Sequence, residues 1–163
     1  MSEGVLDYAL VAQEKVATEQ NALGMLITRL CEQHQFVLVD EGNLEALTQA
    51  SGDMVLLLTE DVVRSPETWD VAIVLPEILK LFGGRLKAAI ADTENSKKLQ
   101  ARFGTTRFPA MVFLRDGEYV DVIQRMLDWD EFVAEVTGVL EKPVGRAPTI
   151  GIPVRNEVAS SCH

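Results

Sequence analysis

The sequence predicts an α/β protein in which a central mixed sheet of four to five strands is covered by helices on both faces. One observation is that apolar runs of strand length alternate along the chain with segments of helical periodicity. Another is that the last two strand candidates are joined by Asp116-Gly117, a strong two-residue hairpin signal. The resulting order, α-β-α-β-α-β-α-β-β-α, is typical of a mixed sheet with helices on both sides.

The first elements are expected in the order helix, strand, helix. Residues 2–33 carry apolar side chains at helical spacing. Residues 36–39 predict a short strand, entered after a polar stretch. Residues 41–50 then predict a helix that Ser51-Gly52 ends.

The middle of the chain combines a buried strand with a polar loop and a long helix. Residues 54–58 are apolar throughout, which favours a strand buried on both faces. Residues 59–70 are polar and acidic, and we expect a loop there with a turn at Ser65-Pro66. Helical spacing resumes at 71–82, although Pro76 inside this segment predicts a kink or a cost of about 3 kcal/mol.

The remaining elements are predicted from clear start and stop signals. Gly104 stands where a left-handed cap ends a helix, and Asp116-Gly117 separates the two strands of a hairpin. The expected ranges are a strand at 86–91, a helix at 95–103, strands at 110–114 and 119–123, and a helix at 129–140.

Pro109 stands directly before the first hairpin strand. A proline at this place is unusual for a central strand, because it removes a backbone donor from the ladder. We therefore predict a cis peptide bond at Phe108-Pro109 that shapes a surface. Either the proline only bends the chain into the strand, or the flattened loop leaves nearby backbone groups free to pair with an extended peptide.

The chain length and the positions of proline and glycine indicate one globular domain with an extension at each end. The 163 residues are enough to bury about two-thirds of the unfolded surface. We expect an N-terminal helical extension at 1–21, a globular domain at 22–142 and a flexible C-terminal tail at 143–163, where proline and glycine break any periodicity.

Composition excludes several classes of function. The net charge of −10 argues against nucleic acid and favours a basic partner. The absence of a membrane-spanning run and of a signal peptide predicts a cytoplasmic protein with no membrane insertion. Cys31 is interpreted as a buried structural thiol, and Cys162-His163 offers too few ligands for a metal site. No metal, cofactor or catalytic residue is predicted.

Two prolines carry a resemblance to the thioredoxin fold. Arg107-Phe108-Pro109-Ala110 is placed like the cis-proline loop of that family, and Pro76 like the proline of the kinked helix that follows its redox motif. Counting back from Pro76, Thr68 and Val71 occupy the positions of the two redox cysteines. Because thiol–disulfide exchange needs a thiolate and a resolving cysteine, these positions cannot perform it.

A closer resemblance is to the HyaE/HupG group of hydrogenase expression/formation proteins, which are thioredoxin-like and lack the redox cysteines. It spans about residues 22–142 and is carried by the segments 26–39, Ser65-Pro66-Glu67, 102–110 and Gly117-x-Tyr119, and by Trp129. This resemblance implies a non-enzymatic chaperone or assembly factor for an uptake [NiFe] hydrogenase. The implied partners are the small-subunit precursor with its twin-arginine signal peptide and, as further candidates, other hydrogenase accessory proteins.

A peptide-binding surface is the predicted functional site. Its acidic part would receive arginines through carboxylate–guanidinium pairs, and a tryptophan would stack on them. The residues are Glu60, Asp61, Glu67, Trp69 and Asp70 from the acidic segment and Arg107, Phe108 and Pro109 from the proline loop.

Interpretations without a binding function remain open for these residues. The acidic side chains are also explained as solvated faces that keep the protein soluble, and Trp69 as a cover for the core. The rival functions are a thioredoxin-class thiol oxidoreductase working through Cys31 or Cys162, and a structural thioredoxin-like module that only dimerises.

Overall fold

A five-stranded mixed sheet forms the centre of the protein, a computed structural model that describes residues 22–40 and 42–148. The strand order is β1-β3-β2-β4-β5, with β1, β3 and β2 parallel and the last two strands antiparallel to their neighbours. The strands are β1 (Val37–Val39), β2 (Asp53–Leu58), β3 (Leu86–Ala91), β4 (Ala110–Arg115) and β5 (Glu118–Ile123). This arrangement is thioredoxin-like and confirms the predicted fold class.

Strand β2 lies at the centre of the sheet. Leu56 faces Ala89 of β3 in parallel register and Val112 of β4 in antiparallel register. Every residue from Met54 to Leu58 is buried, because helices cover both faces of the strand. This double coverage explains why the central strands are continuous apolar runs without alternation.

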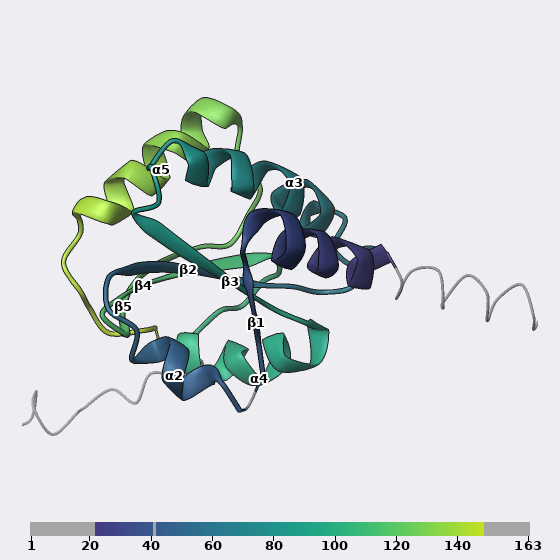
Figure 1. Cartoon of the computed structure of the whole chain (residues 1–163), viewed down its shortest axis with the longest axis horizontal. Coiled ribbons are helices and arrows are strands. Elements are labelled where there is room, and N and C mark those ends of the chain that lie inside the picture. The colour runs from purple at the N-terminus through teal and green to yellow at the C-terminus, as the bar shows by residue number, and fades with distance from the viewer. Residues whose placement is uncertain (1–21, 41, 149–163) are drawn as a thin grey trace, which may run out of the picture.

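The helices form two layers, one on each side of the sheet (Figure 1). The helix over residues 22–34, α3 (Glu67–Lys80) and α5 (Trp129–Glu141) cover one face, and α2 (Leu44–Thr48) and α4 (Thr93–Phe103) cover the other. Each layer has its own apolar core, the larger built around side chains such as Leu75, Phe113 and Phe132. Full burial of side chains of this size contributes about 1.5–3 kcal/mol each.

Helix α3 begins four residues earlier than the periodicity predicts. Residues 67–70, expected to be part of a polar loop, form its first turn, and Pro66 immediately precedes it with φ −58°. A proline fits there because its missing N–H has no helical partner. Glu67 and Asp70 suit this turn because carboxylates interact favourably with the positive end of a helix. The acidic composition therefore marked the start of a helix.

Helix α2 is shorter than the predicted 41–50. The chain before it is held by reciprocal bonds: Asp40 N–H donates to Asn43 Oδ1 at 2.8 Å, and Asn43 N–H donates to Asp40 Oδ1 at 2.9 Å. These reciprocal bonds satisfy two backbone N–H groups in the turn that leads into α2.

The predicted turn and cap signals are confirmed. Asp116 and Gly117 both have positive φ, 52° and 83°, as a type I′ hairpin turn requires. Gly104 ends α4 with φ 64°. A Cβ built at Gly104 would lie 1.9 Å from the carbonyl oxygen of Pro148, so only glycine fits there. The Phe108-Pro109 peptide bond is cis, as predicted.

The segment after α5 runs back along β5. Gly145 N–H donates to the Tyr119 carbonyl at 2.7 Å, and Pro148 reaches Gly104. The predicted N-terminal extension, 1–21, and residues 149–163 of the predicted tail lie outside the described residues.

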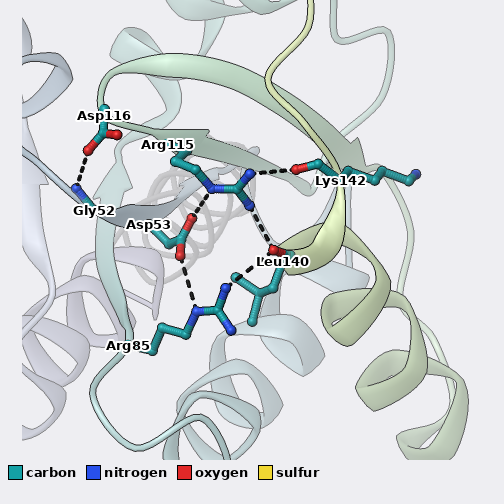
Figure 2. A network of polar contacts seen from close by, with 7 residues as sticks. All are labelled: Gly52, Asp53, Arg85, Arg115, Asp116, Leu140 and Lys142. Atoms are coloured by element: carbon teal, nitrogen blue, oxygen red, sulfur yellow. Dashed lines mark hydrogen bonds and ion pairs between the residues drawn. The ribbon is translucent and has the colours of Figure 1, made fainter.

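An ionic network joins the start of β2 to the end of α5 (Figure 2). Asp53 accepts from Arg115 Nε at 2.7 Å and from Arg85 Nε at 3.2 Å. Both guanidinium groups also donate to the carbonyl of Leu140, at 2.9 and 3.3 Å. The network lies at the end of the sheet where β2 begins, with Asp53. The candidate site described below lies at the other end, where β2 finishes with Leu58.

Candidate functional site

The candidate site lies at the carboxyl end of β2, beside the proline loop. Because β4 is antiparallel to β2, its first residue, Ala110, stands opposite Leu58, the last residue of β2. The segment that leaves β2 toward α3 and the segment that enters β4 are therefore brought to the same end of the sheet. The two parts of the predicted surface start from adjacent strands.

A buried hydroxyl pair connects these two segments. Ser65 Oγ donates to the carbonyl of Phe108 at 2.9 Å, and Thr68 Oγ1 donates to Ser65 Oγ at 3.2 Å. Both residues are buried. The sequence analysis did not assign a role to Ser65 beyond its turn with Pro66; the available signal was a serine just before the first turn of a helix.

The positions of the redox cysteines are filled by side chains with structural roles. Thr68, in the first turn of α3, makes the bond to Ser65, and Val71 is completely buried in the core. Cys31 lies on the helix over residues 22–34, at the margin of the larger core. Its side chain is partly buried, whereas the sequence predicted a buried thiol. Desolvation and, secondarily, Glu32 raise the pKa of the Cys31 thiol, which disfavours the reactive thiolate.

The proline loop is held by a side chain from beyond β5. Gln124 Oε1 accepts from the N–H groups of Thr106 and Arg107 at 2.7 and 3.1 Å. Together with the Ser65 bond to Phe108, this occupies three of the loop's backbone groups. The expectation that the flattened loop leaves its nearby backbone groups free is therefore wrong for these three. What the loop presents is the exposed Arg107 side chain and the half-buried Phe108, while Pro109 is buried.

Two of the predicted acidic residues hold the backbone. Asp61 Oδ1 accepts from the N–H groups of Val63 and Arg64 at 2.8 and 3.1 Å, which shapes the turn before α3. Glu67 Oε2 accepts from the Met126 N–H at 3.3 Å and links α3 to the segment before α5. These bonds fix the direction of both carboxylates.

The exposed part of the first α3 turn includes Trp69 and Asp70 in addition to Glu67. Trp69 is 43% exposed, so a large part of its indole ring is accessible to solvent. Asp70, next to it, is exposed as well. An accessible indole offers an arginine a stacking surface, and an exposed carboxylate offers it a charge partner.

Glu60 and Asp61 line a concavity that none of the other six predicted residues lines. They line a cleft of about 580 Å³ together with residues of the helix over 22–34 and the start of α4. Arg107 instead lines a smaller cavity of about 250 Å³ with Gln124, Arg125 and Glu135. The structure thus divides the predicted site into a cleft, the exposed α3 turn and the proline loop.

Within residues 22–40 and 42–148, no three His, Cys, Asp or Glu side chains are placed to hold a metal ion. In the same part of the chain, no helix combines the length and the apolar character needed to cross a membrane.

Comparison with known proteins places similar sequences in hydrogenase biogenesis. A family described as "Hydrogenase-1 expression protein HyaE" matches residues 26–132. The hydrogenase expression/formation protein HoxO of Cupriavidus necator is 47% identical over 146 residues, which cover 88% of this chain and 91% of that protein. The HupG protein of Rhizobium leguminosarum bv. viciae is 37% identical over 123 residues, covering 73% and 83%. A crystal structure of a putative HupG from Rhodopseudomonas palustris CGA009 is 34% identical, with a TM-score of 0.46, and covers 64% of this chain and 94% of that one.

Proposed function

Because the chain belongs to the HyaE family of hydrogenase expression/formation proteins, we propose that it is a non-enzymatic chaperone for a hydrogenase small-subunit precursor. It binds the precursor and its twin-arginine signal peptide in the cytoplasm, before export. Other hydrogenase accessory proteins are its further candidate partners.

One observation carries the proposal. The cis bond at Phe108-Pro109 and helix α3 with Pro76, the two features that resemble the thioredoxin surface, are both present, with Thr68 and Val71 at the counted cysteine positions. Neither residue can form a mixed disulfide. A surface that keeps this shape without the sulfur chemistry is suited to binding, and binding and shielding are the whole of the proposed mechanism.

The charge of the surface supports a basic ligand. The chain carries a net charge of −10, and Asp70 stands exposed beside Trp69 at the start of α3. Guanidinium groups form two-pronged hydrogen bonds with carboxylates and stack on indole rings, which an ammonium group does less well. Such contacts fix the orientation of the peptide and raise its rate of association.

The test is binding of labelled peptides to the full-length chain, followed by fluorescence anisotropy. We expect a peptide with paired arginines to bind and its affinity to fall as salt is raised. A double-lysine peptide and a scrambled peptide serve as specificity controls. If either binds as tightly as the paired-arginine peptide, the signal-peptide part of the proposal is wrong.

Matched variants on α3 locate the contact. Trp69→Ala and Asp70→Asn should each weaken binding of the paired-arginine peptide. Glu77→Gln is the control, because Glu77 is exposed on the same helix and pairs with Lys80 at 2.9 Å. Equal affinities for all three variants and the unaltered chain would remove the α3 turn from the site.

The two rival functions are tested on the same material. Thiol-dependent reduction of insulin that is lost on replacing Cys31 or Cys162 would establish an oxidoreductase. Capture of nothing but a second copy of the chain, from cells that make the hydrogenase, would establish a dimerisation module. The proposal requires co-purification of the small-subunit precursor.

A further inference from the structure

The cleft that contains Glu60 and Asp61 lies outside the carboxyl ends of the three parallel strands. Leu38 is in β1, Glu60 follows β2, and Asp92 follows β3; all three residues line the cleft. In open α/β sheets, this is the place where ligands bind. Its volume of about 580 Å³ lies within the usual range of ligand pockets, about 300–1,000 Å³.

One wall of the cleft is apolar. The helix over residues 22–34 contributes Leu23, Gly24 and Ile27, and β1 contributes Leu38. Leu38 is 43% exposed, so part of this wall faces solvent. An apolar side chain from a partner would bury this surface together with its own.

The rest of the lining is charged and predominantly acidic. Four carboxylates, Glu60, Asp61, Asp92 and Glu94, stand against two cations, Arg64 and Lys97. Asp92 Oδ1 accepts from the N–H of Asn95 at 2.8 Å, Asp61 accepts from two N–H groups, and Glu60 Oε1 accepts from the Asp61 N–H at 3.1 Å. These carboxylates are already oriented, which lowers the entropy lost when a cation is bound.

We propose that this cleft binds the junction between the basic and the apolar segments of the signal peptide. The inference rests on the proposed function and adds a second contact to the one proposed on the α3 turn. Secretory signal peptides begin with a positively charged segment that leads directly into an apolar one. The positive residues would face the cleft carboxylates, and the first apolar side chains would lie on Leu23, Ile27 and Leu38.

Charge distinguishes this occupant from the chain's own N-terminal segment, which leads directly into the helix that forms the wall. Residues 1–21 contain four acidic residues and a single basic side chain, Lys15. That segment and the cleft therefore carry charge of the same sign, and a basic peptide is the complementary ligand.

Gly24 allows the cleft to be filled without harm to the fold. Nothing lies within 4 Å of a Cβ built at this position, which is inside a helix. Gly24→Trp should narrow the cleft, and replacing glycine in a helix interior favours the helix. Gly138→Trp is the matched control: Gly138 is also in a helix, α5, with nothing within 4 Å of a built Cβ, and it does not line the cleft. Glu60→Gln removes one carboxylate charge and keeps the side-chain shape.

The experiment measures binding of two peptides to the full-length variants by anisotropy. One peptide carries paired arginines followed by apolar residues, and the other has serine in place of the apolar residues. The unaltered chain should prefer the apolar peptide by about tenfold. Gly24→Trp should abolish that preference, Glu60→Gln should weaken both peptides by about fivefold or more, and Gly138→Trp should leave both affinities unchanged.

Other outcomes overturn the inference in recognisable ways. If Gly24→Trp and Glu60→Gln bind normally while Trp69→Ala and Asp70→Asn do not, the cleft is not the seat, and the proposed function stands. If the unaltered chain binds neither peptide, the proposed function fails and the inference fails with it. Faster hydrogen exchange of residues 1–21 in Gly24→Trp than in Gly138→Trp, without peptide, would assign the cleft to the chain's own segment. A dimer dissociated by Gly24→Trp alone would assign it to a second copy.

Discussion

The hydroxyl of Ser65 donates a 2.9 Å hydrogen bond to the carbonyl of Phe108, which lies 43 positions further along the chain. Through this bond the turn before α3 and the proline loop hold one another, and the hydroxyl of Thr68 extends the connection into the helix. This side chain adds a direct link between two parts of the candidate surface that the pairing of β2 with β4 already brings together.

Replacing Ser65 by alanine should destabilise the protein by about 1–2 kcal/mol, because the Phe108 carbonyl and the Thr68 hydroxyl lose a buried partner. Urea unfolding would measure the change. Thr137→Ala is the control, since the Thr137 hydroxyl is exposed on α5 and donates to the Val133 carbonyl of the same helix. A variant as stable as the unaltered chain would show that water replaces the Ser65 hydroxyl without loss.

Asp53→Asn should lower the free energy of unfolding by about 2 kcal/mol. The Asp53 side chain is only 13% exposed and lies between Arg115 and Arg85, so a neutral amide would leave two guanidinium groups without their counter-charge. The midpoint of urea unfolding should fall with an unchanged slope. Glu77→Gln, which breaks the exposed pair with Lys80, should change stability by less than about 0.5 kcal/mol. Equal effects of the two substitutions would contradict a special role for the network.

Tyr119 should make stability depend on pH under alkaline conditions. Desolvation first, and the charge of Asp121 second, raise its pKa to about 12, from about 10 in an unfolded chain. A raised folded pKa gives stability that is fully present below about pH 10 and is lost as the pH rises to about 12. The Tyr119→Phe variant should therefore lose less free energy of unfolding than the unaltered chain between about pH 10 and about pH 12. A phenolate titration in which both tyrosines of the chain have their midpoint near pH 10 would contradict the raised pKa.

The Cys31 thiol should react slowly with alkylating agents. Its pKa is raised by desolvation and by Glu32, so the thiolate fraction at neutral pH is smaller than that of a free thiol. A Cys162→Ser variant isolates this group, and its alkylation rate should lie below that of glutathione and rise in urea. Alkylation faster than glutathione would revive the oxidoreductase alternative.

The sequence predicted the fold in most of its detail because the signals are local. The apolar run at 54–58, the Asp116-Gly117 turn and the proline before β4 each specify one conformation through their own chemistry. The start of α3 was misplaced because acidic residues suit both a solvated loop and the first turn of a helix. Pro66, which is well tolerated at the start of a helix, was the better signal in that segment.

The candidate site was predictable only in part. The proline loop has a local signature, whereas the cleft joins Leu23, Leu38, Glu60 and Asp92, which come from four separate elements. No spacing in the sequence connects them. The role of Gln124 could not be predicted either, because a single glutamine has no distinguishing sequence pattern until the fold brings its amide to the N–H groups of Thr106 and Arg107.

The hydrogen bond from Gly145 to Tyr119 has a consequence for how copies of the protein behave at high concentration. The unpaired backbone of an outermost strand can serve as a template on which a strand of another molecule adds. Here the Tyr119 carbonyl of β5 is already engaged by the chain that follows α5, and β1, at the other border of the sheet, is only three residues long. The engaged carbonyl and the short strand both reduce the backbone on which strands of other molecules could add, a useful property in a molecule proposed to hold a precursor.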